Sequence, residues 1–143
     1  MENTQKTAKV YLSITKGAID TLLALFVLGM IANLYIEIPE GLKNGEAWKW
    51  VFGSSAIIAI HAVLGTLLLL VSVGSLVLAF RTHRNSWITL SAFGLVFTGL
   101  AAYSGSDFVS SGGSELSSLL MASGFLGALV SYGLAVFQTK VIN

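Results

Sequence analysis

The chain has 143 residues, of which 55% are hydrophobic and 10% are charged, and its mean hydropathy is +0.81. This composition excludes an ordinary soluble domain and indicates an integral membrane protein. The sequence contains no cysteine, which excludes thiol-disulfide chemistry, iron–sulfur clusters and thiolate metal sites. A net charge of +1 gives no indication of a nucleic-acid partner.

Four apolar segments are long enough, or nearly so, to cross a hydrocarbon core about 30 Å thick, which requires roughly 20 helical residues. They cover residues 17–36, 52–80, 87–103 and 116–137. The connections between them are too short to hold a soluble domain, so we expect residues 1–143 to form a single membrane domain. The expected fold is an all-α bundle of four transmembrane helices, in contact with the lipid bilayer of a bacterial or archaeal cell membrane.

Basic residues predict the orientation of this bundle, because Lys and Arg in short loops resist translocation across the membrane. They precede the first span, follow the fourth, and separate the second from the third (Lys6, Lys9, Lys16, Arg81, Arg84 and Lys140). The other two loops are acidic on balance (Glu37, Glu40, Glu46, Asp107 and Glu115 against Lys43 and Lys49). Both termini are therefore expected in the cytoplasm, with Trp48 and Trp50 at the outer membrane interface and Trp87 at the inner one.

The second and fourth spans share a sequence pattern. The segment "GTLLLLVSVGSLV" from Gly65 aligns with "GFLGALVSYGLAV" from Gly124, and the alignment also matches Gly74 with Gly133. Leu25 to Gly29 and Leu95 to Gly99 give a weaker match between the first and third spans. One interpretation is the duplication of a two-helix hairpin, and the other is chance similarity, which apolar sequences produce easily. Under duplication, the two hairpins would have the same orientation and pack about an axis normal to the membrane.

Small and polar residues form a stripe on each predicted helix, and such stripes face neighbouring helices in membrane proteins. On the second span this stripe contains His61, Gly65 four residues later, and then Ser72, Ser75 and Ala79. At about 1.5 Å of rise per residue, His61 lies at a depth comparable to that of Met121 on the fourth span and Asn33 on the first. Tyr103 lies somewhat nearer the outer surface. These residues are expected around one pocket in the outer half of the bundle.

An ionisable side chain inside a membrane indicates a candidate functional site, because its desolvation is costly. One interpretation is that His61 ligates b-type haem, with Met121 as a second metal ligand. Another is that His61 holds a quinone or a different lipid, and a third is that a neutral His61 bonds only to a serine, tyrosine or asparagine of a neighbouring helix. The residues assigned to the cofactor site are His61, Met121, Gly65, Gly124, Asn33 and Tyr103.

The segment "HAVLGTLLLL" resembles the haem-ligating helices of membrane proteins of the cytochrome b561 type and the haem A synthase type. The resemblance covers roughly one span, and it implies a four-helix core that holds b-type haem and handles electrons at the membrane. Those families use paired histidines on facing helices. Here the only other histidine is His83, in the turn "RTHRNS". If haem is bound, the sequence therefore favours one haem over two, and His61 would hold it alone or together with Met121.

Other classes of membrane protein fit the sequence to different degrees. No carboxylate lies near the middle of a predicted span, which argues against a proton-coupled exporter. No complete set of catalytic residues accompanies His61, so the sequence does not indicate an enzyme. The alternative to a cofactor protein is a non-catalytic accessory or scaffold subunit that associates with another membrane protein or with a second copy of the chain.

Overall fold

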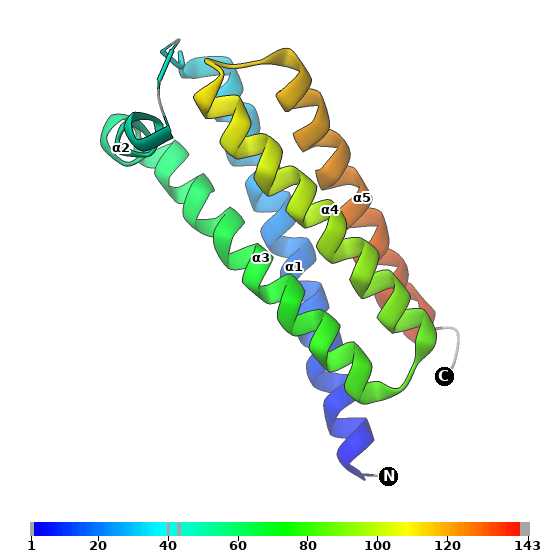
Figure 1. Cartoon of the computed structure of the whole chain (residues 1–143). Helices are drawn as coiled ribbons and strands as arrows, with labels where there is room; N and C mark the ends of the chain where they lie inside the picture. Colours follow the sequence, from blue (N-terminus) through cyan, green and yellow to red (C-terminus); the bar gives the residue numbers. More distant parts are fainter. Residues whose placement is uncertain (1, 40, 43, 141–143) are drawn as a thin grey trace.

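The computed structural model describes residues 2–39, 41–42 and 44–140, and this part of the chain contains five helices and no strand. Four long helices run side by side as a bundle: α1 (Glu2–Tyr35), α3 (Ala56–Thr82), α4 (Asn85–Ser110) and α5 (Glu115–Lys140) (Figure 1). The short helix α2 (Asn44–Ser54) lies across one end of the bundle, which we call the α2 end. The helix ends nearest to the two chain termini lie at the opposite end, which we call the termini end. The predicted all-α four-helix bundle is confirmed.

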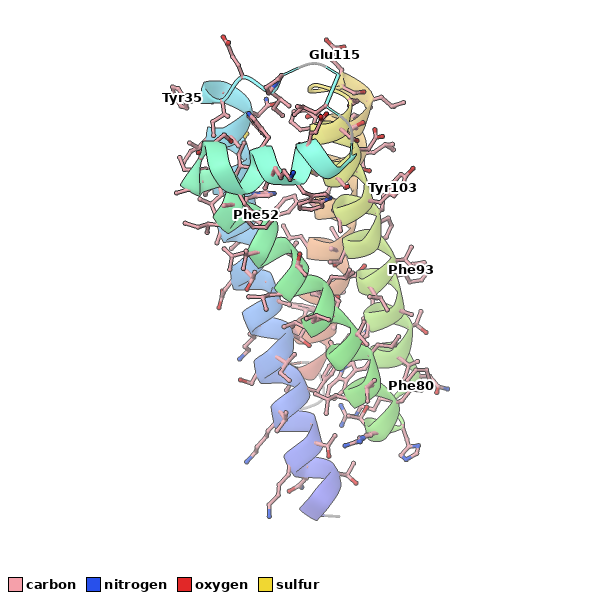
Figure 2. The ribbon with its side chains drawn as sticks, turned by 60° about the vertical axis from the view of Figure 1, so that its left-hand side comes forward. Tyr35, Phe52, Phe80, Phe93, Tyr103 and Glu115 are labelled. Atoms are coloured by element: carbon pink, nitrogen blue, oxygen red, sulfur yellow. The ribbon has the colours of Figure 1, made fainter. Side chains whose placement is uncertain are left out.

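The surface of the bundle suits a lipid environment. Each of the four long helices is long and apolar enough to cross a membrane. Large apolar side chains such as Leu34, Leu70 and Val96 are 64–65% exposed, and Figure 2 shows Phe80 and Phe93 projecting away from the bundle. Soluble proteins rarely expose apolar surface on this scale. The protein is therefore a multi-pass integral membrane protein whose outer surface contacts lipid.

The first helix is longer than predicted. The apolar span was expected from residue 17, whereas α1 begins at Glu2. The helix continues because Tyr11, Thr15 and Ala18 form a buried stripe against its neighbours, and the lysines of this segment are exposed on the other side. Hydropathy alone does not detect a helical segment in which few residues are buried and the exposed residues include several charged ones.

The predicted second span, residues 52–80, is divided in the structure. Helix α2 ends at Ser54 and α3 begins at Ala56, with Ser55 between them as the N-cap residue of α3. The backbone of Ser55 is extended (φ −153°, ψ 128°), and its side-chain oxygen accepts a hydrogen bond from the Ile57 N–H at 3.3 Å. Serine is a favoured N-cap because it satisfies a backbone donor that the first turn leaves unpaired. Glu40 and Lys43, which the sequence places before α2, lie outside the described residues.

The four long helices form a closed ring in which each contacts two others. The most extensive contacts are those of α4 with α5 and of α1 with α3, and the ring is completed by α3 with α4 and α1 with α5. Each of the two extensive pairs is antiparallel (Figure 1). The bundle is thus two hairpins packed side by side, α1–α3 and α4–α5.

Side chains fill the termini end of the bundle. Trp87, near the start of α4, is 1% exposed and stacks on Tyr11 of α1, with 4.6 Å between the ring centroids. The Tyr11 hydroxyl is 3.0 Å from the hydroxyl of Ser91, and the guanidinium carbon of Arg84 lies 4.5 Å from the centroid of the Trp87 ring. Trp87 therefore does not face the membrane interface as predicted, because its ring belongs to the interior of the bundle.

Candidate functional site

A cavity of about 330 Å³ lies inside the bundle near the α2 end, and all five helices contribute to its lining. The lining residues extend from Asn33 and Ser110, near the ends of α1 and α4, to Leu22, Thr98 and Ala128 deeper in the bundle. The separation between Leu22 and Asn33 along α1 corresponds to about 16 Å of helical rise. The cavity is therefore elongated along the bundle axis, and its volume falls within the range of about 300–1,000 Å³ that is typical of ligand sites.

Helix α2 covers this cavity at the end of the bundle. Ala47 and Val51, four residues apart on one face of α2, are 4% and 2% exposed and line the cavity. Trp48 also lines it, while its ring stacks on that of Phe52 at a centroid distance of 6.2 Å. The sequence analysis did not predict α2: it placed residues 44–51 in the loop before the second span and residues 52–54 in that span. The signal that identifies it is the run Gly53–Ser54–Ser55, which ends one helix and caps the next.

Four of the six predicted site residues line the cavity. His61 and Gly65 contribute from α3, Asn33 from α1 and Met121 from α5. The three residues that were compared by depth along their helices, His61, Met121 and Asn33, thus meet around one space.

The structure does not bring the other two predicted residues, Tyr103 and Gly124, to the cavity. Tyr103 is 73% exposed and projects outward from α4 (Figure 2). Gly124 lies in the contact between α5 and α4, where an added Cβ would be 2.7 Å from the carbonyl oxygen of Phe97 and 2.8 Å from the amide nitrogen of Ala101. Its absent side chain therefore lets two backbones approach closely.

His61 lies against α1. A Cβ added at Gly29 would be 3.2 Å from the His61 Cε1, so the glycine leaves room for the ring. The Nδ1 atom of His61 is buried and makes no hydrogen bond of standard geometry. The backbone group that interacts with the ring is the carbonyl of Leu25. Among the residues that the structure describes, no serine, tyrosine or asparagine side chain bonds to His61. The bond that a purely structural His61 was expected to make with such a side chain is therefore not found in this part of the chain.

The other ring nitrogen of His61 is the chemically available one. Nε2 is neither enclosed nor hydrogen-bonded to the described part of the chain, and the residue lines the cavity. In a neutral imidazole one nitrogen carries the proton and the other carries a lone pair. A proton on Nδ1, directed at the Leu25 carbonyl, leaves the lone pair of Nε2 available to a ligand.

Met121 completes one side of the cavity. Its Sδ would lie 3.4 Å from a Cβ added at Gly105, so the thioether packs against the last turns of α4 at ordinary contact distance. Within the described ranges, no cluster of three or more His, Cys, Asp or Glu residues could hold a metal ion. A metal at this site would therefore depend on His61, with Met121 as the one soft donor of the predicted ligand pair.

The lining carries little polarity and no formal charge. Among the described residues that line the cavity, none is Asp, Glu, Lys or Arg, and His61 is the only titratable side chain. The hydroxyls of Thr66 and Thr98 donate to carbonyls of their own helices, at 2.9 and 2.8 Å, and Ser110 does the same at 3.1 Å. The polar side chains that make no hydrogen bond of standard geometry in the described chain are those of Asn33, Trp48, His61, Ser106 and Ser118.

The predicted b-type haem agrees with the ligand atoms of this site but not with its charge. His61 offers an accessible nitrogen, and Met121 lines the same space. A haem also carries two propionate carboxylates, and no cation is found among the described lining residues. The segments that form the α2 end, residues 36–55 and 104–115, contain five carboxylates and two lysines, so their net charge repels anions. The donor set suits the iron, whereas the charge does not suit the propionates.

The argument for function depends on this geometry. No protein-family model matches the chain, and no curated protein or solved structure is significantly similar to it.

Proposed function

We propose that this membrane protein binds a planar or lipophilic cofactor in the cavity at the α2 end, with His61 as the polar anchor. One observation carries the proposal: an apolar cavity in the bundle contains a histidine whose Nε2 is accessible and has no partner in the described chain. An ionisable residue is costly inside a membrane, and a pocket lined by apolar groups with a few convergent polar ones is the usual form of a small-molecule site.

One candidate cofactor is b-type haem, which would supply one-electron chemistry when bound. The Nε2 of His61 would hold the iron on one side, and Met121 is the candidate for the other side. A ligating histidine typically donates its second N–H to a carboxylate, a backbone carbonyl or a water, which fixes the ring. The interaction of the His61 ring with the Leu25 backbone carbonyl supports this role for His61.

The proposal includes an orientation and a location. The exposed lysines Lys6, Lys9 and Lys16 lie on the part of α1 toward the termini end, and the α2 end is acidic on balance. By the preference of basic residues for the cytoplasmic side, the cavity would lie in the outer half of a bacterial or archaeal cell membrane. Its ligand would then be drawn from the outer leaflet or from the outer surface.

The alternative is an accessory or scaffold subunit in which His61 serves packing alone. The contact between the His61 ring and Gly29 favours it, because this contact already helps to hold α3 against α1. The partner would be another membrane protein or a second copy of the chain.

The first experiment compares the protein purified in mild detergent with two variants, His61→Ala and His83→Asn. His83 is the matched control because it lies outside the cavity, and asparagine tolerates its left-handed backbone (φ 55°). We would record visible absorption spectra of the oxidised and reduced proteins, and identify copurified lipids by mass spectrometry.

Haem ligation predicts a Soret band in the wild type and in His83→Asn that weakens or shifts in His61→Ala. A colourless protein that stays colourless after haem is added excludes haem at this site. If no lipophilic compound is retained in a His61-dependent manner either, the cofactor function is rejected. The search then moves to copurifying protein partners.

A further inference from the structure

We infer that the ligand of this cavity is an uncharged membrane lipid whose polar group donates a hydrogen bond to His61, as the hydroxyl of a quinol does. The inference rests on the proposed function and narrows its ligand to one chemical class. Three properties of the cavity support it: its charge, its shape and the hydrogen-bonding state of His61.

The charge of the site favours a neutral ligand. An anionic head group needs a cation or several N–H donors near it when it leaves water. The described lining residues include no lysine or arginine, and the segments that form the α2 end have five carboxylates against two lysines. A cationic head group would also lack a partner, since no carboxylate lies in the same lining. A neutral polar group avoids both costs.

The shape of the site favours an amphiphile with one extended tail. The polar residues without partners are close to the helix ends: Asn33 is near the end of α1, Ser106 is in the last turns of α4, and Ser118 is in the first turn of α5. Deeper in the bundle the lining becomes apolar at Leu68 and Ala128. A head group at the α2 end and a hydrocarbon tail along the bundle axis would match this division.

The hydrogen-bonding state of His61 favours a donor on the ligand. Nδ1 is the enclosed nitrogen on the side of the ring that faces α1, and the backbone group of α1 that interacts with the ring is an acceptor, the Leu25 carbonyl. A proton on Nδ1 is therefore the favoured state. Nε2 then has a lone pair and accepts a hydrogen bond. The serine and asparagine side chains of the lining near the α2 end can both donate and accept hydrogen bonds. They therefore suit a second hydroxyl or an ether oxygen of the same head group.

The test is a set of thermal unfolding curves, followed by circular dichroism at 222 nm, of the full chain in mild detergent. The probes are decylubiquinol under argon, decylubiquinone and haem b. Decylubiquinol has hydroxyl groups that can donate hydrogen bonds, whereas decylubiquinone has carbonyl groups that can only accept them. Haem b tests a ligand with two carboxylates. The variants are His61→Ala, the control His83→Asn, and His61→Phe, which keeps a ring against Gly29 but has no nitrogen.

We expect decylubiquinol to raise the Tm of the wild type and of His83→Asn by about 4 °C at saturation, because a ligand that binds only the folded state stabilises it. The concentration needed for half of this rise should be at least tenfold higher in His61→Ala and His61→Phe. Decylubiquinone should bind several-fold more weakly than decylubiquinol, and haem b should give no rise in Tm.

The outcomes separate the inference from the proposed function. If haem b raises the Tm in a His61-dependent manner, alone or as strongly as decylubiquinol, the inference is overturned and the cofactor function stands. Equal shifts from decylubiquinone and decylubiquinol overturn the assignment of a donor on the ligand. If no probe gives a shift that depends on His61, the proposed function itself fails.

Discussion

Three glycines of the α4–α5 hairpin differ in their surroundings from the glycines of the α1–α3 hairpin. In the α4–α5 hairpin, Gly94, Gly124 and Gly127 have no room for a side chain, because an added Cβ would lie 2.5–2.7 Å from the nearest atom of the facing helix. In the α1–α3 hairpin, an added Cβ at Gly17, Gly65 or Gly74 meets nothing within 4 Å. The exception is Gly29, whose neighbour is the ring of His61.

This difference shows how glycine can allow close packing of helices in one hairpin and leave space for a ligand in the other. In the α4–α5 hairpin, Gly124 lets two backbones approach closely, and Gly94 and Gly127 make room for the rings of Tyr132 and Phe97. Close packing at small residues is a usual source of stability between helices in a membrane. In the α1–α3 hairpin the same residue type leaves space, and Gly65 lines the cavity. The α4–α5 hairpin is therefore expected to determine stability, and the α1–α3 hairpin is expected to determine ligand binding.

The largest expected effect comes from Gly124→Ala. The new Cβ would lie 2.7 Å from the carbonyl oxygen of Phe97 and 2.8 Å from the amide nitrogen of Ala101, and neither backbone atom can move without shifting α4. We expect the free energy of unfolding to fall by about 2–3 kcal/mol, as in other overpacked interiors. Thermal unfolding in mild detergent measures this change as a lower Tm.

Gly133→Ala is the control on the same helix. Nothing lies within 4 Å of the added Cβ, so the expected change is between no effect and a gain of about 0.5 kcal/mol from the better helix propensity of alanine. Equal losses in the two variants would show that the α4–α5 contact is looser than the structure indicates, and the contrast between the hairpins would be lost.

A second variant, Gly29→Ala, tests the α1–α3 hairpin. The added Cβ would be 3.2 Å from the His61 Cε1, so the ring must move by a few tenths of an ångström toward the cavity. We expect ligand affinity to fall about three- to tenfold, measured with whichever probe proves to bind, and the free energy of unfolding to change by less than about 1 kcal/mol.

Gly99→Ala is the matched control, because Gly99 is aligned with Gly29 in the predicted repeat and an added Cβ there has no neighbour within 4 Å. Its ligand affinity should equal that of the wild type. An unchanged affinity in Gly29→Ala would show that the position of the His61 ring does not control binding.

Much of this architecture could be predicted from the sequence because membrane helices follow simple rules. Hydropathy predicted four spans, and the stripe of small residues on α3 correctly placed Ser72, Ser75 and Ala79 inside the bundle. Depth counting along the helices brought His61 and Met121 to one cavity, since helical rise is constant. These predictions succeeded where a regular helix converts sequence spacing directly into position.

The sequence analysis failed where position depends on rotation or on a break in the helix. Tyr103 was placed by depth alone, and the rotation of α4 turns it toward the outside. Gly124 was assigned to the same site as Gly65, yet the two glycines face different surroundings. Helix α2 was missed because a serine cap, rather than a change in hydropathy, separates it from α3. Rotation and capping depend on tertiary contacts that a hydropathy pattern does not encode.

The smallest expected effect comes from Tyr132→Phe, and its sign makes it informative. Tyr132 of α5 is completely buried, and its hydroxyl has no hydrogen bond of standard geometry. The hydroxyls of Ser72 and Thr98 are beside the Tyr132 hydroxyl, but each donates to a carbonyl of its own helix at 2.8 Å. Removing a buried polar group without a partner avoids its desolvation cost. We therefore expect the free energy of unfolding to stay within about 0.5 kcal/mol of the wild type or to rise.

Tyr11→Phe is the counterpart on the other hairpin, since the Tyr11 hydroxyl is bonded to that of Ser91 at 3.0 Å. Its removal also leaves the Ser91 hydroxyl without this partner, so we expect a loss of about 1 kcal/mol. Thermal unfolding of both variants under the same conditions gives the comparison. A larger loss in Tyr132→Phe than in Tyr11→Phe would mean that the Tyr132 hydroxyl has a bonding partner in the membrane. The rigidity of the α4–α5 hairpin would then depend on a polar contact as well as on its glycines.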